Sequence, residues 1–206
     1  MTLEEKKAVN KLCIGIDIDE VLCQMMKEYV NFLNIKFPDV KVTFNDMVWF
    51  YARKTPLFIK RWVTKEKGQQ FMKELFLSAD KREVVPGSKE KLQEWKQQWH
   101  SLVIITGRNP SNQHKTDVRL DTHFPQIFDK VLYSSKNTST EMKKSDLCKQ
   151  AGIQIVIEDE LDNVNDIVKN WIPCSLFDKP RNQDYIPEKY PNVTKINSRD
   201  EIVLPS

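Results

Sequence analysis

The sequence predicts an α/β protein, in which a parallel sheet carries helices on both faces and a small helical insertion follows the first strand. Two observations support this fold class. Short apolar runs alternate along the chain with segments of helical spacing, which is typical of a parallel sheet covered on both sides. The first connection is also long, because roughly sixty residues separate the first apolar run from the resumed alternation, more than a helix and two loops need.

The apolar runs and the helical patterns between them define the predicted elements. Strands are predicted at residues 12–16, 102–105, 131–133, 153–157 and 174–177. Helices are predicted at residues 89–99, 144–150 and 161–171. After Phe177 the chain becomes rich in proline and polar residues, which indicates a loop-rich C-terminal tail.

Local signals mark the ends of these helices. Ser88 precedes the first of them and is the expected N-cap. Gly152 follows the second helix, where a left-handed glycine commonly ends a helix. The third helix has the spacing of an amphipathic helix, with one face formed by Val164, Ile167, Val168 and Trp171.

Residues 22–84 form the long first connection and predict a helical insertion with its own core, at the mouth of the first strand. The segment is rich in aromatic residues, mostly at helical spacing: Tyr29, Phe32, Phe37, Phe44, Trp49, Phe50, Tyr51, Phe58, Trp62, Phe71 and Phe76. Most of them are expected in a core, whereas the stretch 49–54 interleaves aromatic and basic side chains that could stack on a base and meet a phosphate. The predicted organisation is an α/β core of residues 1–21 and 85–206 with the insertion 22–84.

The composition indicates a globular protein with a substantial core. The chain has 206 residues, 40% of them hydrophobic, and a net charge of +3. It lacks a run of about 20 apolar residues and an apolar signal core near its N-terminus, so a cytoplasmic enzyme without membrane contact is expected. The slightly basic balance fits anionic substrates but not a dedicated nucleic-acid binder. Four scattered cysteines suggest reduced, mostly buried thiols.

Two aspartates directly follow the first strand. Asp17 and Asp19 are two residues apart, so in extended backbone both carboxyl groups project to the same side. Two acids held this close suit a hard cation such as Mg²⁺ and a nucleophile and acid pair for phosphoryl chemistry. An isolated pair is weak evidence, because acids also end buried strands where the chain returns to water.

Polar residues also follow the other strands, at the edge where ligands bind in parallel sheets. Thr106, Gly107 and Arg108 follow the second strand and combine a hydroxyl, an accessible backbone and a cation, which suits a phosphate. The segment 158–160 is acidic and follows the fourth strand, and the segment 178–181 follows the fifth. Each is ordinary alone, but their coincidence at one edge predicts a functional site.

These segments together resemble the haloacid dehalogenase-like (HAD) hydrolases. The resemblance rests on four motifs in the family's order: 17–21, 105–108, Lys144 with 146–148, and 157–159. It covers nearly the whole chain and implies a Rossmann-like core with a helical cap inserted after the first strand, here residues 22–84. Within the superfamily the chain looks most similar to the 5'(3')-deoxyribonucleotidase-type phosphatases, which share an Asp-basic-Pro-x-Asn loop like that at 178–182.

The resemblance implies a role for each motif. Asp17 would attack phosphorus to give an aspartyl-phosphate, and Asp19 would protonate the leaving oxygen and then activate water. Mg²⁺ would be held by the Asp17 side chain, the Asp19 backbone carbonyl and Asp159. The phosphate would be bound by Thr106, the Gly107 N–H and Lys144.

Three positions leave alternatives open. Lys143 and Lys136 compete with Lys144, which is preferred for its place at a helix start in a Lys-x-x-x-Cys context. Glu158 stands where many relatives have an acid that supports the metal ligand. Glu20 stands where glycine is common, so it would either narrow the substrate range or point away from the site.

The predicted function is a Mg²⁺-dependent phosphomonoesterase acting on a nucleotide or another small phosphate. Two alternatives remain: a non-catalytic binding or regulatory domain on the same fold, and a phosphatase for RNA or DNA ends, suggested by basic residues near the aromatic stretch. A halide-removing hydrolase is disfavoured, because that chemistry needs neither the second aspartate nor a metal site. A phosphomutase would need a cap that excludes water.

Overall fold

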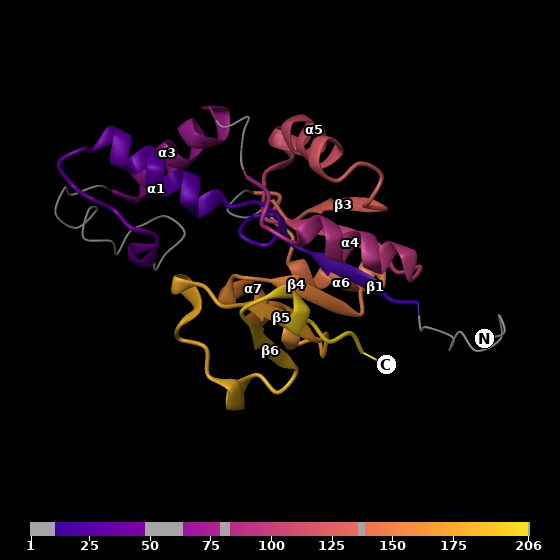
Figure 1. Cartoon of the computed structure of the whole chain (residues 1–206). Coiled ribbons are helices and arrows are strands. Elements are labelled where there is room, and N and C mark those ends of the chain that lie inside the picture. The colour runs from indigo at the N-terminus through magenta and orange to yellow at the C-terminus, as the bar shows by residue number, and fades with distance from the viewer. Residues whose placement is uncertain (1–10, 48–63, 79–82, 136–138, 206) are drawn as a thin grey trace.

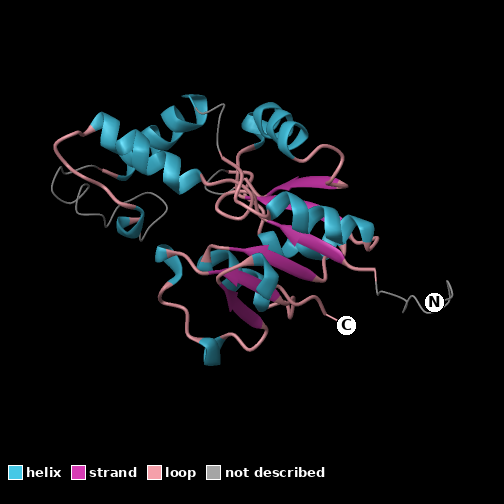
Figure 2. Cartoon of the chain, viewed as in Figure 1, coloured by secondary structure: helices cyan, strands magenta, loops and turns pink. Residues whose placement is uncertain are grey.

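A six-stranded parallel sheet forms the centre of the molecule (Figure 1). The computed structural model describes residues 11–47, 64–78, 83–135 and 139–205. The strand order is β3-β2-β1-β4-β5-β6, and every neighbouring pair is parallel. Helices lie on both faces of the sheet (Figure 2). The predicted fold class, including the helical insertion, is confirmed.

The predicted elements occur in the predicted order, with small shifts of their ends, and the structure adds a helix at Gln113–His123 that was not predicted. The strands are β1 (Cys13–Ile16), β2 (Ser101–Thr106), β3 (Lys130–Tyr133), β4 (Ile155–Glu158), β5 (Cys174–Phe177) and β6 (Val193–Ile196). The α-helices are α1 (Met25–Lys36), α3 (Lys65–Ser78), α4 (Ser88–Gln97), α5 (Gln113–His123), α6 (Lys144–Ala151) and α7 (Leu161–Val168). The short 3-10 helices include η2 (Phe44–Asp46), η4 (Pro180–Asn182) and η6 (Arg199–Glu201).

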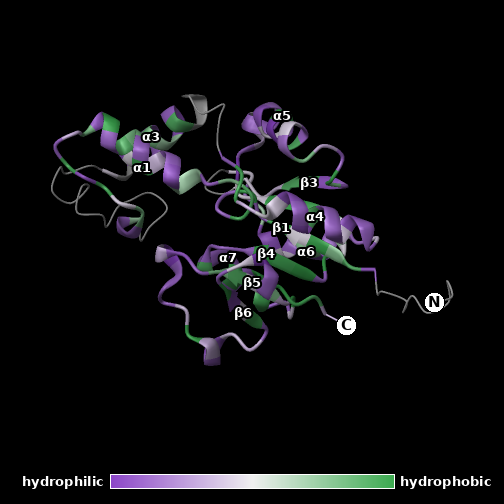
Figure 3. Cartoon of the chain, viewed as in Figure 1, coloured by the Kyte–Doolittle hydropathy of each residue, from purple (hydrophilic) through white to green (hydrophobic). Residues whose placement is uncertain are grey.

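Alternate residues of the central strands face two separate hydrophobic clusters. Ile14 and Ile16 of β1 pack in the cluster that includes Leu92 and Trp95 of α4. Val156 of β4 points the other way, into the cluster that holds the apolar residues of α6 and α7. Because side chains alternate across a strand, the apolar runs supply both faces at once. The central strand β4 accordingly carries the green, apolar colour in Figure 3.

The order of the strands places a topological switch point beside β1. From β1 the chain continues to β2 on one side, while β4 pairs with β1 on the other. Open α/β sheets bind ligands at such a point, beyond the carboxyl ends of the strands. The backbone N–H of Asp17 donates to the carbonyl of Ile157, at 3.0 Å, so the ends of β1 and β4 are fixed together there.

Gly15 in β1, just before the aspartates, leaves room for two buried side chains, one from β2 and one from the connection before β4. A Cβ atom at this position would lie 3.0 Å from Cδ1 of Ile105 and 3.1 Å from Cγ2 of Ile153. Side chains in close-packed interiors tolerate such contacts only by shifting. The glycine therefore serves packing here.

The helical segment of residues 25–78 has its own hydrophobic cluster. Tyr29 and Leu33 of α1 are buried together with Phe71 and Leu75 of α3, and Phe37 packs edge-on against Phe71. The described aromatic residues of this cluster are therefore core, as expected. Trp49, Phe50, Tyr51, Phe58 and Trp62, with the whole stretch 49–54, lie outside the described residues.

The two chain segments that join the helical segment to the sheet pair with each other. Gln24 N donates to Glu83 O at 2.9 Å, and Val85 N donates to Leu22 O at 2.8 Å. Arg199 of η6 then holds both segments, because its guanidinium donates to the carbonyl of Val21 and, at 3.1 Å, to the carbonyl of Pro86. One side chain near the C-terminus thus fixes where the helical segment leaves and rejoins the core.

Three local predictions are corrected by the structure. The C-terminal segment contains a sixth strand, β6, which the sequence analysis missed because only its two end residues are buried, as on a sheet edge. Ser88 is not an N-cap: Gly87, with φ of 77°, precedes the helix, and Ser88 is its first residue. Trp171 is not part of a helical face, because α7 ends at Val168 and Trp171 is 82% exposed in the turn that follows.

Two further observations concern composition. The four cysteines are free, and three of them are buried, as expected for reduced thiols. Among the described residues, no helix has both the length and the apolar character that a bilayer-spanning helix requires.

We predict that Gly15→Ala destabilises the protein by about 1–3 kcal/mol, because the new methyl group overpacks the contact with Ile105 and Ile153. Chemical denaturation of both proteins measures the loss. Shortening the contacted side chain with Ile105→Val should recover part of it in the double variant. Strict additivity of the two single changes would show that the Cβ contact is not the cause.

Candidate active site

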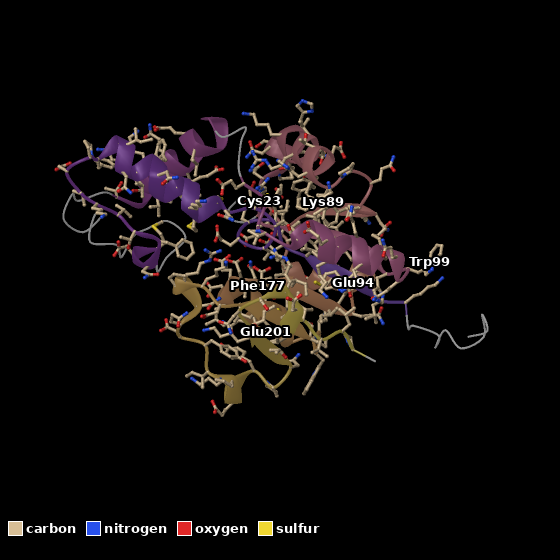
Figure 4. All side chains as sticks on the ribbon, viewed as in Figure 1. Cys23, Lys89, Glu94, Trp99, Phe177 and Glu201 are labelled. Carbon is tan, nitrogen blue, oxygen red and sulfur yellow. The ribbon has the colours of Figure 1, made fainter. Side chains whose placement is uncertain are left out.

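Four charged side chains meet at the carboxyl end of the sheet, between β1 and β4. Asp17 follows β1, Glu158 ends β4, Asp159 comes next, and Lys144 begins α6. All four are buried. In Figure 4 the labelled residues Cys23, in the loop after β1, and Phe177, at the end of β5, lie at this edge. The structure therefore brings together residues that are up to 142 positions apart, from Asp17 to Asp159.

The carboxylate of Asp17 is held from two directions. Its Oδ1 atom accepts a hydrogen bond from Lys144 Nζ at 2.7 Å, and its Oδ2 atom accepts one from the backbone N–H of Asp19 at 3.1 Å. The loop after β1 thus turns back on its own first aspartate. This fixes the direction of the carboxylate before any substrate arrives.

Lys144 forms the centre of the cluster. Its Nζ atom lies 2.7 Å from Asp17 Oδ1 and 2.7 Å from Glu158 Oε2. The helix start is itself anchored, because the backbone N–H and the hydroxyl of Ser145 both donate to the carboxylate of Asp166 in α7. Of the competing lysines, Lys143 is exposed at the N-cap of α6, and Lys136 lies outside the described residues.

The two acids at the end of β4 have different surroundings. Glu158 is fully buried and accepts hydrogen bonds from Lys144 and from Asn163 Nδ2, the latter at 2.9 Å. The backbone carbonyl of Asp159 accepts from Asn182 Nδ2, also at 2.9 Å. Glu158 therefore lies closer to the centre of the site than a purely supporting residue would.

Three carboxylates are near enough to share one cation. Asp17, Glu158 and Asp159 each offer an oxygen atom, and the three oxygens lie within 4.8 Å of one another. An all-oxygen set of this kind fits Mg²⁺. Glu158 thus joins Asp17 and Asp159, the two side chains expected to hold the metal. The third expected ligand, the backbone carbonyl of Asp19, is not a side chain and so is not part of this set.

Burial changes the acid–base properties of the pair at the centre. Desolvation raises the pKa of Asp17 to about 7, with Glu158 and Asp19 adding to the rise and Lys144 opposing it. Burial alone would lower the pKa of Lys144, but the two carboxylates raise it above its ordinary value. Lys144 is thus held in its protonated form. A cation bound near Asp17 would favour the ionised form of the Asp17 carboxyl group.

Arg108 pairs with Asp19, a role that the sequence analysis did not assign to it. Its Nη2 lies 2.6 Å from Asp19 Oδ1 and its Nε lies 3.1 Å from Oδ2, which is a two-point contact. Nη1 also donates to the hydroxyl of Thr116 in α5. The expected phosphate cation is instead drawn to the second aspartate, because a planar guanidinium matches a carboxylate.

Thr106 and Gly107 occupy the end of β2 as predicted. Thr106 is fully buried, and its hydroxyl oxygen accepts a hydrogen bond from the N–H of Arg108 at 3.2 Å. Gly107 is half-buried between them. β2 pairs directly with β1, so these residues lie on the neighbouring strand to Asp17.

Glu20 connects the site loop to the helical segment. Its φ of 64° explains why glycine is a natural occupant of this position. Its carboxylate accepts from the N–H of Met26 at 2.6 Å, in the first turn of α1, and lies 3.8 Å from Lys179 Nζ. These contacts direct the carboxylate to the start of α1, where it caps the helix, and an effect of Glu20 on the substrate range stays a prediction.

The loop after β5 contributes two cations at this edge, where the sequence analysis expected the segment 178–181 without giving either residue a role. Lys179 reaches Glu20, and Arg181 forms an ion pair with Asp159. The basic residues of the segment 178–182 were the available signal. Their targets could not be inferred, because the loop meets β1 and β4 only in the folded sheet.

Comparisons with known proteins place this fold. No protein-family model matches the chain, and no curated protein matches it. A candidate phosphoglycolate phosphatase from Lactobacillus delbrueckii subsp. bulgaricus has a similar structure, with a TM-score of 0.66 and 13% identity over 92% of this chain and 95% of that one. A protein described as a predicted phosphatase from Clostridium acetobutylicum has a TM-score of 0.63 and 19% identity, covering 93% and 95%.

A third similar structure is a HAD-hydrolase, YfnB from Bacillus subtilis, which is described as bound to magnesium. Its TM-score is 0.60, with 16% identity, and the match covers 93% of this chain and 96% of that one. At such identities the likeness shows that this chain shares its fold with these three proteins. None of these three is described as a nucleotidase, so the nearer resemblance to deoxyribonucleotidase-type enzymes stays a prediction.

We predict that Lys144→Met lowers the free energy of unfolding by about 3–5 kcal/mol, because it leaves Asp17 and Glu158 buried without their cation. Lys143→Met is the matched control: it removes the same group from the adjacent exposed position, and its effect should stay within about 0.5 kcal/mol. Urea denaturation compares the two. Equal losses would contradict the central position of Lys144.

Proposed function

We propose that this protein is a Mg²⁺-dependent phosphomonoesterase that forms an aspartyl-phosphate intermediate. The observation that carries the proposal is the buried cluster of Asp17, Lys144, Glu158 and Asp159 at the switch point of the sheet. Three acids and a cation buried together are costly to stability, so they favour a functional role. The shared fold with HAD-like phosphatases supports the same conclusion.

Asp17 is the proposed nucleophile. One of its oxygens attacks phosphorus, the bond to the ester oxygen breaks, and the phosphoryl group is transferred to the carboxylate. The hydrogen bonds from Lys144 and from the Asp19 N–H hold the carboxylate in one orientation, so little freedom is lost on attack. Water then cleaves the acyl phosphate and restores Asp17.

Asp19 is the proposed proton carrier. It protonates the leaving oxygen in the first step and accepts a proton from the attacking water in the second. Arg108 fixes the rotamer of Asp19 through its two-point contact. It also favours the ionised carboxylate, so we propose that this contact loosens when the phosphate dianion arrives and Asp19 takes up its proton.

Lys144, Thr106 and the Gly107 N–H are the proposed phosphate ligands. Lys144 already contacts the carboxylate of Asp17, which is the group that would attack the phosphorus. A fixed cation and preoriented donors stabilise the oxygens as their charge grows in the transition state. Mg²⁺ would be held by Asp17, Asp159 and the Asp19 carbonyl, with Glu158 beside them. It would offset the repulsion between the Asp17 carboxylate and the phosphate dianion.

We propose that residues 22–84, which contain the helical segment, form a cap that covers the substrate. Its entry loop carries Asp17, Asp19 and Glu20, and η2 contacts η4 of the core. We propose a small phosphate such as a nucleotide as substrate, with the cap selecting among such molecules. A protein that turned over no phosphomonoester would instead be a binding domain on this fold.

Replacing the nucleophile should abolish turnover. With Mg²⁺, we expect the wild type to hydrolyse an aryl phosphate and to lose activity with a chelator, while Asp17→Asn should lose at least about 10⁴-fold in kcat because an amide cannot form the acyl phosphate. Asp146→Asn, an exposed acid of α6, is the matched control and should keep wild-type rates. Normal turnover in Asp17→Asn would refute the nucleophile assignment.

Replacing the proton carrier should depend on the leaving group. Asp19→Asn should reduce hydrolysis of an alkyl phosphate by about 10²–10⁴-fold more than hydrolysis of an activated aryl phosphate, because an alkoxide needs protonation to leave. The ratio of the two rates in a single protein sample cancels any loss of folded enzyme. A ratio equal to that of the wild type would contradict the acid role.

A further inference from the structure

The loop after β5 places a buried arginine on an expected metal ligand. The guanidinium of Arg181 forms an ion pair with Oδ2 of Asp159, and the two side chains are only 5% and 2% exposed. Burial lowers the pKa of Arg181, and four acids of the site, Glu20, Asp17, Glu158 and Asp19, oppose that shift. Arg181 is therefore part of the charge balance of the site.

The charges of the cluster explain why a second cation is present. Asp17, Glu158 and Asp159 carry up to three negative charges, whereas Lys144 is bonded to the first two only. A buried carboxylate without a partner is strongly destabilising. Arg181 supplies the partner for the third carboxylate, so each of the three acids is buried with a cation beside it.

The same contact conflicts with metal binding. Asp159 offers one of the three oxygens that could hold a cation, yet its carboxylate is already paired with the guanidinium. Two cations on one carboxylate repel each other strongly in a buried site. A divalent ion at this position therefore competes with Arg181 for the charge of Asp159, and its binding would be strengthened if the guanidinium withdrew.

We propose that Arg181 is an exchangeable counter-ion. It neutralises Asp159 in the metal-free protein, leaves when Mg²⁺ binds, and then contacts the phosphate of the substrate. This inference rests on the proposed function. The withdrawn guanidinium remains next to the site, and its planar fork matches phosphate oxygens as well as it matches a carboxylate.

The backbone of the loop is held while the side chain exchanges. Asn182 is fully buried, and its Nδ2 donates to the carbonyls of Asp159 and Phe177, at 2.9 and 2.6 Å. Its Oδ1 accepts from the N–H of Lys179 at 3.1 Å. The position of Arg181 beside the site is thus fixed by its neighbour, and only the side-chain torsions of the arginine need to change.

The test measures Mg²⁺ binding to the metal-free protein by calorimetry, without any substrate. Arg181→Gln removes the competing charge, so its Kd for Mg²⁺ should fall by at least about tenfold. Lys179→Gln removes a cation from the same loop that pairs with Glu20 and should change the Kd by less than about twofold. An unchanged or weakened Mg²⁺ affinity in Arg181→Gln overturns the proposal.

Two further measurements cover the second half of the exchange and a folding failure. With Mg²⁺ saturating, inorganic phosphate should bind Arg181→Gln about tenfold more weakly than the wild type, and an unchanged affinity overturns the transfer to phosphate. Arg181→Lys keeps the positive charge but loses the two-point contact of the guanidinium. Its Kd for Mg²⁺ should therefore lie between those of the wild type and Arg181→Gln. If Arg181→Gln fails to fold, a Kd for Arg181→Lys equal to that of the wild type overturns the proposal.

These outcomes separate the inference from the proposed function. Binding of Mg²⁺ and phosphate is measured without turnover. A tighter Mg²⁺ site in Arg181→Gln together with no phosphatase activity in the wild type would support the exchange and refute the enzyme. Normal turnover by the wild type, together with an unchanged Mg²⁺ Kd in Arg181→Gln, would support the enzyme and refute the exchange.

Discussion

The ammonium of Lys144 is the interaction on which the site depends. It lies between Asp17 and Glu158, which end β1 and β4, and both contacts are buried hydrogen-bonded ion pairs. Two carboxylates could not be buried side by side without it, because their desolvation and mutual repulsion would favour another arrangement of the loops. The two hydrogen bonds from Ser145 to Asp166 are therefore as important for the site as the acids, because they fix the start of α6, which carries Lys144.

The surrounding fold supplies the geometry that this cation requires. β1 has β2 on one side and β4 on the other, so the two loops that carry acids leave the sheet at the same point. Gly15 keeps the layer beneath close-packed. The helical segment is tied to the same loop through Glu20, which caps α1, and through Arg199, which holds both connecting segments. A motion of the helical segment would thus be felt at the loop that carries the two aspartates.

Elements with a strong local signal were predictable, and those defined by distant contacts were not. The central strands consist of continuous apolar residues because they are buried on both faces, so their runs could be recognised. β6 pairs on one side only and only its two end residues are buried, so it has no continuous apolar run that could be recognised. Trp171 has helical spacing in the sequence, but the chain turns after Val168 and leaves it exposed. Turn geometry overrode periodicity at that position.

The α/β class, the helical insertion and the acids, hydroxyl and lysine at one edge of the sheet could be inferred without coordinates. These follow from local patterns, because each chemical group lies at the end of its own strand or begins its own helix. The pairing of the charges depends instead on the folded sheet: Arg108 meets Asp19, Arg181 meets Asp159, and Glu158 lies at the centre of the cluster. Side chains 22 or 89 residues apart pair when the sheet closes, and no spacing in the chain encodes that choice of partner.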